Sequence, residues 1–199
     1  RLCWPGWAQS LREQGAQVDQ LFDLDYCRGA VPEPERVTVV GGGISAMQAA
    51  VALAQRGPTT LVARHAPRVA QLDADPGWLG PKRMARFRAE PRPTRRRATI
   101  DAARYRGSAP PDVMRAFRWA KDRHGLQRGT ADIEAAEVDA QGAVRLTLRR
   151  MSKPLVGDVQ LRSVRRRERT TQTVDRVVLA TGFEAGRPGG AWLDAAVKR

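Results

Sequence analysis

The chain has 199 residues, 42% of them hydrophobic, and a formal net charge of +14. The apolar content is enough for the core of one domain. No stretch approaches the roughly 18 consecutive apolar residues of a membrane-spanning helix, so the sequence predicts no membrane association.

The basic excess consists almost entirely of arginine: 31 of the 35 basic residues are arginines and four are lysines. Such an excess is compatible with nucleic-acid binding. The arginines are scattered and few aromatic residues lie among them, so we favour a compositional bias with solvated surfaces. Two arginine runs, residues 95–97 and 165–167, fall in polar segments that we expect to be loops.

Cysteine and histidine usage predicts neither a metal site nor a redox pair. Cys3 and Cys27 form no CxxC motif, which argues against a thioredoxin-like pair or a zinc site. His65 and His124 are too few to build a histidine-based metal site. A reduced, cytoplasmic setting is therefore expected.

The N-terminal half contains a strand, turn, helix and strand in close succession. A helix is expected over residues 7–15 and a proline-rich loop over 31–35. Residues 36–40 form a β-branched run typical of a buried strand, and good helix formers follow over 44–56. A second buried strand is expected at 59–63. The short spacing predicts two parallel strands joined by a crossover helix.

The middle of the chain is expected to be irregular before a clear helix. Residues 65–108 are basic and contain five prolines, so they read as an irregular insertion. A helix is expected over 110–124, with Pro111 in its first turn and Gly125 as its C-terminal stop.

The C-terminal third predicts a β-meander and one more buried strand. Two strand-like runs, 133–139 and 143–148, flank a Gln-Gly pair that favours a hairpin. A third, more polar strand is expected at 159–164. Residues 175–183 form a buried strand that runs into a glycine turn. The expected fold class is therefore α/β, a Rossmann-like parallel sheet with flanking helices and a β-meander over roughly 131–164.

The strongest motif fits the G-x-G-x-x-(G/A) pattern of dinucleotide-binding domains, and its residues are Gly41, Gly42, Gly43, Ile44, Ser45 and Ala46. Gly41 would make the tight turn out of the strand, Gly43 would let a pyrophosphate approach the backbone, and Ala46 would let the helix pack closely. The helix N-terminus would offer free N–H groups to the phosphates. The position between a predicted strand and helix makes this motif specific.

The end of the second strand favours NADP(H) over NAD(H). NAD-type sites usually carry an Asp or Glu there, which binds the ribose hydroxyls. This chain has Arg64, followed by His65 and Arg68. A guanidinium can bind a 2′-phosphate with two hydrogen bonds. The alternative is that Arg64 is one surface arginine among many.

A second motif ends the last predicted strand, at Thr181, Gly182 and Phe183. The pairing of residues 39–46 with residues 178–183 resembles the two-dinucleotide-binding flavoproteins, which include the flavin-containing and the N-hydroxylating monooxygenases. The resemblance covers about residues 10–185. It implies a function in hydride transfer from NADPH to FAD, with Gly41–Ala46, Arg64, His65, Arg68 and Thr181–Phe183 as cofactor-binding residues.

The resemblance also implies a domain organisation. In such enzymes an NADPH domain is inserted into an FAD domain. We therefore expect residues 1–35 to lead from an FAD domain absent here, residues 36–185 to bind NAD(P), and residues 186–199 to begin the return. The intact enzyme would use FAD and a small-molecule substrate that the sequence does not identify.

The sequence departs from the flavin-containing monooxygenases in one motif. These enzymes place F-x-G-x-x-x-H before the NADPH motif. Here Gly15 can occupy the glycine position, but Glu13 and Asp19 stand where Phe and His are expected. This weakens the resemblance to that subgroup and leaves the broader flavoprotein assignment intact.

No constellation of catalytic residues is visible, as is usual where a flavin carries the chemistry. The alternatives are a flavin-dependent reductase without oxygen activation, a basic nucleic-acid-binding protein on a nucleotide-binding scaffold, and a non-catalytic remnant. The oligomeric state is left open.

One glycine motif, assigned to NADPH, predicts that this chain will not hold FAD tightly. Protein purified from flavin-replete cells should lack the visible flavin absorbance bands. Stoichiometric flavin absorbance in the purified chain would contradict this prediction.

Overall fold

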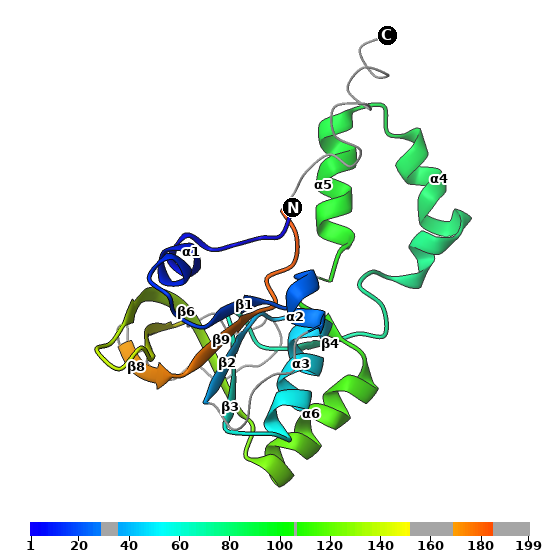
Figure 1. The fold of residues 1–199 in the computed structure, drawn as a ribbon. Coiled ribbons are helices and arrows are strands. Elements are labelled where there is room, and N and C mark those ends of the chain that lie inside the picture. The colour runs from blue at the N-terminus through cyan, green and yellow to red at the C-terminus, as the bar shows by residue number, and fades with distance from the viewer. Residues whose placement is uncertain (29–35, 106, 152–168, 185–199) are drawn as a thin grey trace.

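The computed structural model describes residues 1–28, 36–105, 107–151 and 169–184, and its centre is a seven-stranded sheet in the order β1-β9-β2-β3-β6-β7-β8 (Figure 1). The predicted loop 31–35, the expected strand 159–164, the arginine run 165–167 and the segment 186–199 lie outside the described residues.

Four short parallel strands form the part of the sheet that carries the glycine motif. They are β1 (Val18–Gln20), β9 (Arg176–Leu179), β2 (Val37–Val40) and β3 (Thr59–Ala63). Helix α3 (Ile44–Ala54) crosses from β2 to β3. All four residues of β9 are buried, because the strand lies between two others and has packed layers on both faces.

Helices α3 and α6 (Pro111–His124) cover one face of this sheet (Figure 1). Met47 of α3 and Phe117 of α6 are buried in one cluster with Val39 and Leu61 from the strands. Gly125 ends α6 in the left-handed conformation, at φ 67°. The predicted helix and its stop are therefore confirmed.

The other face packs against α1 (Gly6–Glu13) and the meander of β6 (Gln127–Val138), β7 (Val144–Arg150) and β8 (Arg169–Val174). Strand β6 serves both parts, because residues 127–130 pair parallel with β3 and the rest pairs antiparallel with β7. The hairpin turn at Gly142, at φ 83°, is confirmed.

The described strand that pairs with β7 was not predicted, and the strand expected at 159–164 lies outside the described residues. The observed strand, β8, lies at 169–174, because Val144–Arg149 of β7 pair there, residue by residue, with Val174–Arg169. Its sequence, Arg-Thr-Thr-Gln-Thr-Val, contains four β-branched residues, which suit a strand, but it lacks the apolar run or alternation that marks one in the sequence. The pairing of β1 with β9 was also not foreseen, and it brings the N-terminal segment into the sheet. A short helix, α2 (Leu24–Arg28), follows β1.

The expectation of an irregular segment at 65–108 is wrong. The chain there forms a two-stranded ribbon, β4 (Arg68–Val69) with β5 (Ser108–Ala109), the short 3₁₀ helix η1 (Pro76–Leu79), and helices α4 (Pro81–Ala89) and α5 (Pro93–Ala103). Three of the five prolines, Pro76, Pro81 and Pro93, misled the prediction because they stand in the first turn of a helix, where the missing N–H costs nothing. The arginine run 95–97 is accordingly helical, not a loop.

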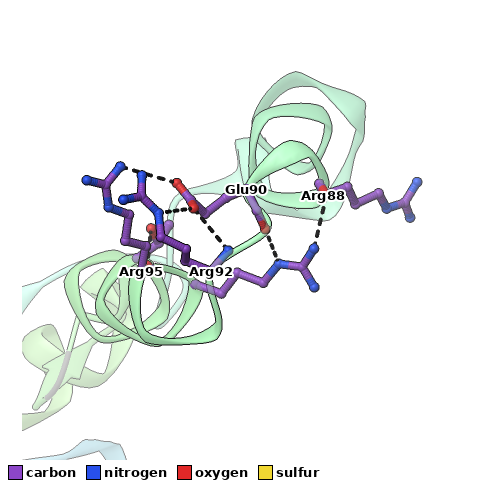
Figure 2. Close-up of polar contacts among 6 residues, drawn as sticks. Arg88, Glu90, Arg92 and Arg95 are labelled. Atoms are coloured by element: carbon purple, nitrogen blue, oxygen red, sulfur yellow. Dashed lines mark hydrogen bonds and ion pairs between the residues drawn. The ribbon is translucent and has the colours of Figure 1, made fainter.

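Arginine contacts, rather than a buried core, stabilise the connection between α4 and α5, and no residue of either helix is buried. Glu90, in the turn, accepts hydrogen bonds from Arg92 N at 3.1 Å and Nε at 3.2 Å, and it pairs with Arg95 at 3.8 Å (Figure 2). Arg96 donates to the carbonyls of Glu90 and Arg88, which lie at the C-terminal end of α4. The pair stands away from the sheet (Figure 1).

The α/β class, the parallel sheet with flanking helices and the meander are confirmed. Among the described residues, no helix is long and apolar enough to cross a membrane.

An exposed ion pair joins the starts of β2 and β9 and predicts a pH-dependent stability. Asp175 accepts hydrogen bonds from Arg36 N at 2.8 Å, Nε at 3.0 Å and Nη2 at 2.5 Å. The Arg36 side-chain hydrogen bond lowers the pKa of Asp175 below its ordinary value, against a smaller opposing effect of burial. A depressed pKa stabilises the fold above the unfolded-state pKa, and this stabilisation is lost as the pH falls through the folded value.

Asp175→Asn should therefore be modestly less stable than the wild type at pH 7, because exposed pairs contribute little. The difference should shrink as the pH falls below about 4, the ordinary range of an aspartate. Urea denaturation of both proteins across this range tests it. A difference that stays constant with pH would show that the carboxylate charge is irrelevant.

Candidate dinucleotide site

A cavity of about 770 Å³ opens where the parallel strands β9, β2 and β3 end. The turn after β2 lines its middle, residues after β3 line one side, and residues after β9 line the other. In open α/β sheets, ligands bind in the crevice at the carboxyl ends of the strands where the strand order reverses. Here the order reverses at β2, because β3 lies on one side of it and β9 on the other.

Eleven of the twelve residues that the sequence singled out line this one cavity: Gly41, Gly42, Gly43, Ile44, Ser45, Ala46, Arg64, His65, Thr181, Gly182 and Phe183. Arg68 is not among the lining residues. Its guanidinium lies over the ring of Tyr105, 5.8 Å from the centroid, because the β4–β5 ribbon brings these two side chains together.

The three glycines of the turn meet different surroundings. A Cβ on Gly41 would lie 2.5 Å from the Ala180 carbonyl oxygen and 2.9 Å from the Ala46 Cβ, so β2, β9 and α3 converge there. A Cβ on Gly42 would lie 2.8 Å from the imidazole of His65. A Cβ on Gly43 would meet nothing within 4 Å. Gly41 is thus required by packing, whereas the space beside Gly43 is open.

The N-terminus of α3 carries unsatisfied N–H groups at this open space. Gly43 is the N-cap residue and has no side chain to accept from them. The first hydrogen bond of the helix is donated by Met47 N to Gly43 O, at 3.2 Å. The N–H groups of Ile44, Ser45 and Ala46 precede it and have no acceptor within the helix. Together with the helix dipole they favour an anion.

One side of the cavity is cationic. Arg64 and His65 follow β3, and Arg104, which follows α5, lines the same side. No carboxylate follows β3 at this point. Asp132 of β6 also lines the cavity, but its Oδ2 lies 3.3 Å from Nη2 of Arg149. The acidic group therefore has a cation of its own.

The backbone at His65 is held in place by a half-buried arginine. Arg128 donates from Nη2 to the carbonyl of His65 at 2.8 Å. Burial lowers the pKa of the Arg128 guanidinium from its ordinary value. The imidazole Nδ1 can donate to the carbonyl of Ala66 at 2.9 Å. On its far side the ring packs against Gly107, at φ 69°, where a Cβ would lie 2.0 Å from the imidazole Cε1.

The opposite side of the cavity is apolar and aromatic. Phe22 and Phe183 lie with ring centroids 5.2 Å apart, and Trp7 lines the same cavity. Thr181 donates from Oγ1 to the carbonyl of Cys3 at 2.5 Å and accepts from Gln20 Nε2 at 3.1 Å. These bonds fix the segment after β9 beside the N-terminal residues.

Sequence reasoning missed Arg104, Phe22 and Trp7. Each comes from an element remote in sequence from the glycine motif, and no local pattern indicates that it approaches the cavity. Asp19, at the histidine position of the F-x-G-x-x-x-H motif, forms an ion pair with the buried Arg176 between β1 and β9. Its role in this structure is therefore to join two strands.

The different surroundings of the glycines predict different effects of substitution on stability. Gly41→Ala should destabilise the fold by about 1–3 kcal/mol, because the added methyl group meets a backbone carbonyl rather than a flexible side chain. Gly43→Ser should be neutral within about 0.5 kcal/mol, because the site is open and serine is a good N-cap residue. Equilibrium urea denaturation measures both. Equal losses in the two variants would contradict the geometry of the turn.

Solved structures with the same fold include a cadaverine monooxygenase and two ornithine hydroxylases. An FAD-bound cadaverine monooxygenase from Erwinia amylovora aligns with TM-score 0.69 at 15% identity, covering 100% of this chain and 45% of that one. The ornithine hydroxylase of Pseudomonas aeruginosa aligns with TM-score 0.66 at 18% identity, covering 98% of this chain and 46% of that one. An ornithine N-hydroxylase of Kutzneria sp. 744, with reduced FAD, NADP⁺ and L-ornithine, aligns with TM-score 0.64 at 20% identity, covering 89% of this chain and 44% of that one. The chain therefore spans less than half the length of these enzymes.

A search of curated proteins gave no match. The family model of L-lysine 6-monooxygenase/L-ornithine 5-monooxygenase matches residues 9–185, which is most of the chain and includes the glycine turn, the cationic side and the end of β9. The chain therefore belongs to the L-lysine 6-monooxygenase/L-ornithine 5-monooxygenase family.

Proposed function

We propose that this chain is the NADPH-binding part of an FAD-dependent monooxygenase that hydroxylates a small primary amine. One observation carries the proposal for this chain. The open glycine turn at the N-terminus of α3 and the cation Arg64 after β3 line the same cavity. Family membership supports the FAD-dependent monooxygenase activity and the amine substrate, since the family is that of lysine and ornithine monooxygenases.

The residues of the cavity fit the parts of NADPH in order. The N–H groups of Ile44–Ala46 suit the pyrophosphate, and the missing side chain of Gly43 leaves room for it. Arg64, with His65 beside it, suits the 2′-phosphate of the adenosine ribose. The opposite, apolar side, with Phe22 and Phe183, would then take the nicotinamide end. When bound, NADPH supplies a hydride for the flavin.

The chain's own residues would act by binding and orientation. Arg128 fixes the backbone of His65 on the adenosine side. On the nicotinamide side, Thr181 and Gln20 fix the segment after β9 through the Cys3 carbonyl. Holding both ends would place the nicotinamide reproducibly, which is the protein's main contribution where a cofactor carries the chemistry. We propose no catalytic residue and no metal ligand in this chain.

The rest of the assignment concerns the whole enzyme. FAD and the amine substrate would be bound largely by segments outside this chain, whose relatives are more than twice as long. Family membership favours oxygen activation over a simple flavin reductase. A cytoplasmic location and a partner set without nucleic acid or membrane remain predictions from the sequence.

The preference for NADPH over NADH is the first test. A charged hydrogen bond is worth about 1.5–3 kcal/mol, so the wild type should bind NADPH about tenfold or more tightly than NADH. Arg64→Glu should abolish this preference, because a carboxylate repels the 2′-phosphate and can accept from ribose hydroxyls. Gly43→Val should weaken the binding of both cofactors equally, because its side chain would occupy the space beside the pyrophosphate, where an added Cβ meets no protein atom within 4 Å.

Fluorescence or calorimetric titration of both cofactors against the three proteins measures these effects. Equal affinity for NADPH and NADH in the wild type, unchanged in Arg64→Glu, would reduce Arg64 to a surface arginine. Undiminished binding in Gly43→Val would remove the glycine turn from the site.

A further inference from the structure

The cationic side of the cavity contains an arginine that comes from neither of the motifs that predict the site. Arg104 follows Arg64 by 40 positions and stands at the C-cap of α5, yet both side chains line the same cavity with His65. The helical pair α4–α5 thus returns to the sheet at the place where the chain leaves β3. Two cations from separate elements therefore line one cavity, and Gly107, three residues after Arg104, packs against the His65 ring beside Arg64.

The backbone around Arg104 is well defined. Residues Ala74 and Arg104 form an antiparallel bridge, and Tyr105 N donates to the carbonyl of Asp73 at 2.6 Å. Ser108 N then donates to the carbonyl of Tyr105 at 3.1 Å, where the chain enters the β4–β5 ribbon. These contacts are made by main-chain atoms, so they do not depend on the Arg104 side chain.

The Arg104 guanidinium has a weak protein partner. Its Nη2 lies 3.7 Å from Asp73 Oδ2, beyond hydrogen-bond distance, and the two side chains are 58% and 71% exposed. Exposed pairs of this kind contribute little and leave the cation available to a stronger anion. A phosphate in the cavity would be such an anion.

Arg68 provides a natural comparison. It lies close to Arg64 in sequence and carries the same charge, but its guanidinium lies over Tyr105 and it does not line the cavity. Its position in the sequence therefore suggests Arg68 as a second cationic residue of the site, whereas the structure places Arg104 there. The two arginines sit on adjacent parts of the same insertion, which makes them a matched pair for experiment.

We propose that Arg104 is a specificity-determining residue that binds the 2′-phosphate of NADPH together with Arg64. This inference rests on the proposed function of the cavity. A 2′-phosphate carries up to two negative charges and three acceptor oxygens, so it can engage two guanidinium groups that approach from different elements. NADH lacks this group, and Arg104 therefore discriminates between the cofactors without affecting the shared pyrophosphate.

The test is a titration of NADPH and NADH against the wild type, Arg104→Ala, Arg68→Ala and Asp73→Ala. Arg104→Ala should weaken NADPH about tenfold and leave NADH within twofold, since one charge-assisted hydrogen bond is lost at a partly exposed site. Arg68→Ala should leave both affinities within twofold. Thermal unfolding of each variant confirms that the fold is retained.

Asp73→Ala separates ligand binding from a structural role. If Arg104 binds the phosphate, removing its weak acidic partner should leave NADPH affinity unchanged or raise it. If Arg104 only holds the base of α4–α5 through Asp73, then Asp73→Ala should weaken NADPH as much as Arg104→Ala does, and the proposal is overturned. Equal behaviour of Arg104→Ala and Arg68→Ala would also overturn it.

These outcomes are distinct from a failure of the proposed function. A wild type that binds NADPH and NADH equally, or neither, contradicts the cofactor assignment itself. A wild type that prefers NADPH, loses this preference in Arg64→Glu and keeps it in Arg104→Ala contradicts the role of Arg104 alone.

Discussion

The close approach of β2, β9 and α3 at Gly41 is the constraint on which the rest of the site depends. No side chain fits there, because a Cβ would lie 2.5 Å from the Ala180 carbonyl. Because the three elements lie so close together, α3 begins directly after the glycine turn, at Ile44. The residues that carry its first free N–H groups, Ile44–Ala46, therefore line the cavity. The close approach also brings the segment after β9, with Thr181 and Phe183, to the same edge as Arg64. The close packing at Gly41 therefore brings the segments after β9 and β3 to the same cavity.

Arginine serves two different purposes in this chain, although the composition alone suggests one. Arg83 joins α4 to η1 through Asp75 and the Trp78 ring. Arg92 and Arg96 stabilise the connection between α4 and α5 through Glu90, its carbonyl and the Phe87 ring, in place of a hydrophobic core. Arg64 and Arg104 instead line a cavity whose acidic residue, Asp132, is already paired. The arginines that line the cavity support a local anion site more directly than a general nucleic-acid-binding surface. The arginines around α4 and α5 show that part of the basic excess stabilises the fold.

The sequence could predict those helices, strands and turns that are determined by residues close together in the chain. The β2–α3–β3 unit, helix α6 with its stop at Gly125 and the β6–β7 hairpin all follow from local patterns, and the structure confirms them. It could not predict α4 and α5, because a proline that breaks a helix and one that begins it look alike out of context. Nor could it identify Arg104, because its place in the cavity depends on the path of the whole 65–108 segment.

The central claim is that the carboxyl ends of β9, β2 and β3 bind one NADPH molecule across the glycine turn. A crystal structure of this chain with NADPH tests it most directly. The account predicts the pyrophosphate at the N–H groups of Ile44–Ala46, the 2′-phosphate within hydrogen-bond distance of Arg64, and the nicotinamide toward Phe22 and Phe183. NADPH bound elsewhere, or bound in the opposite direction with its nicotinamide against Arg64, would contradict it.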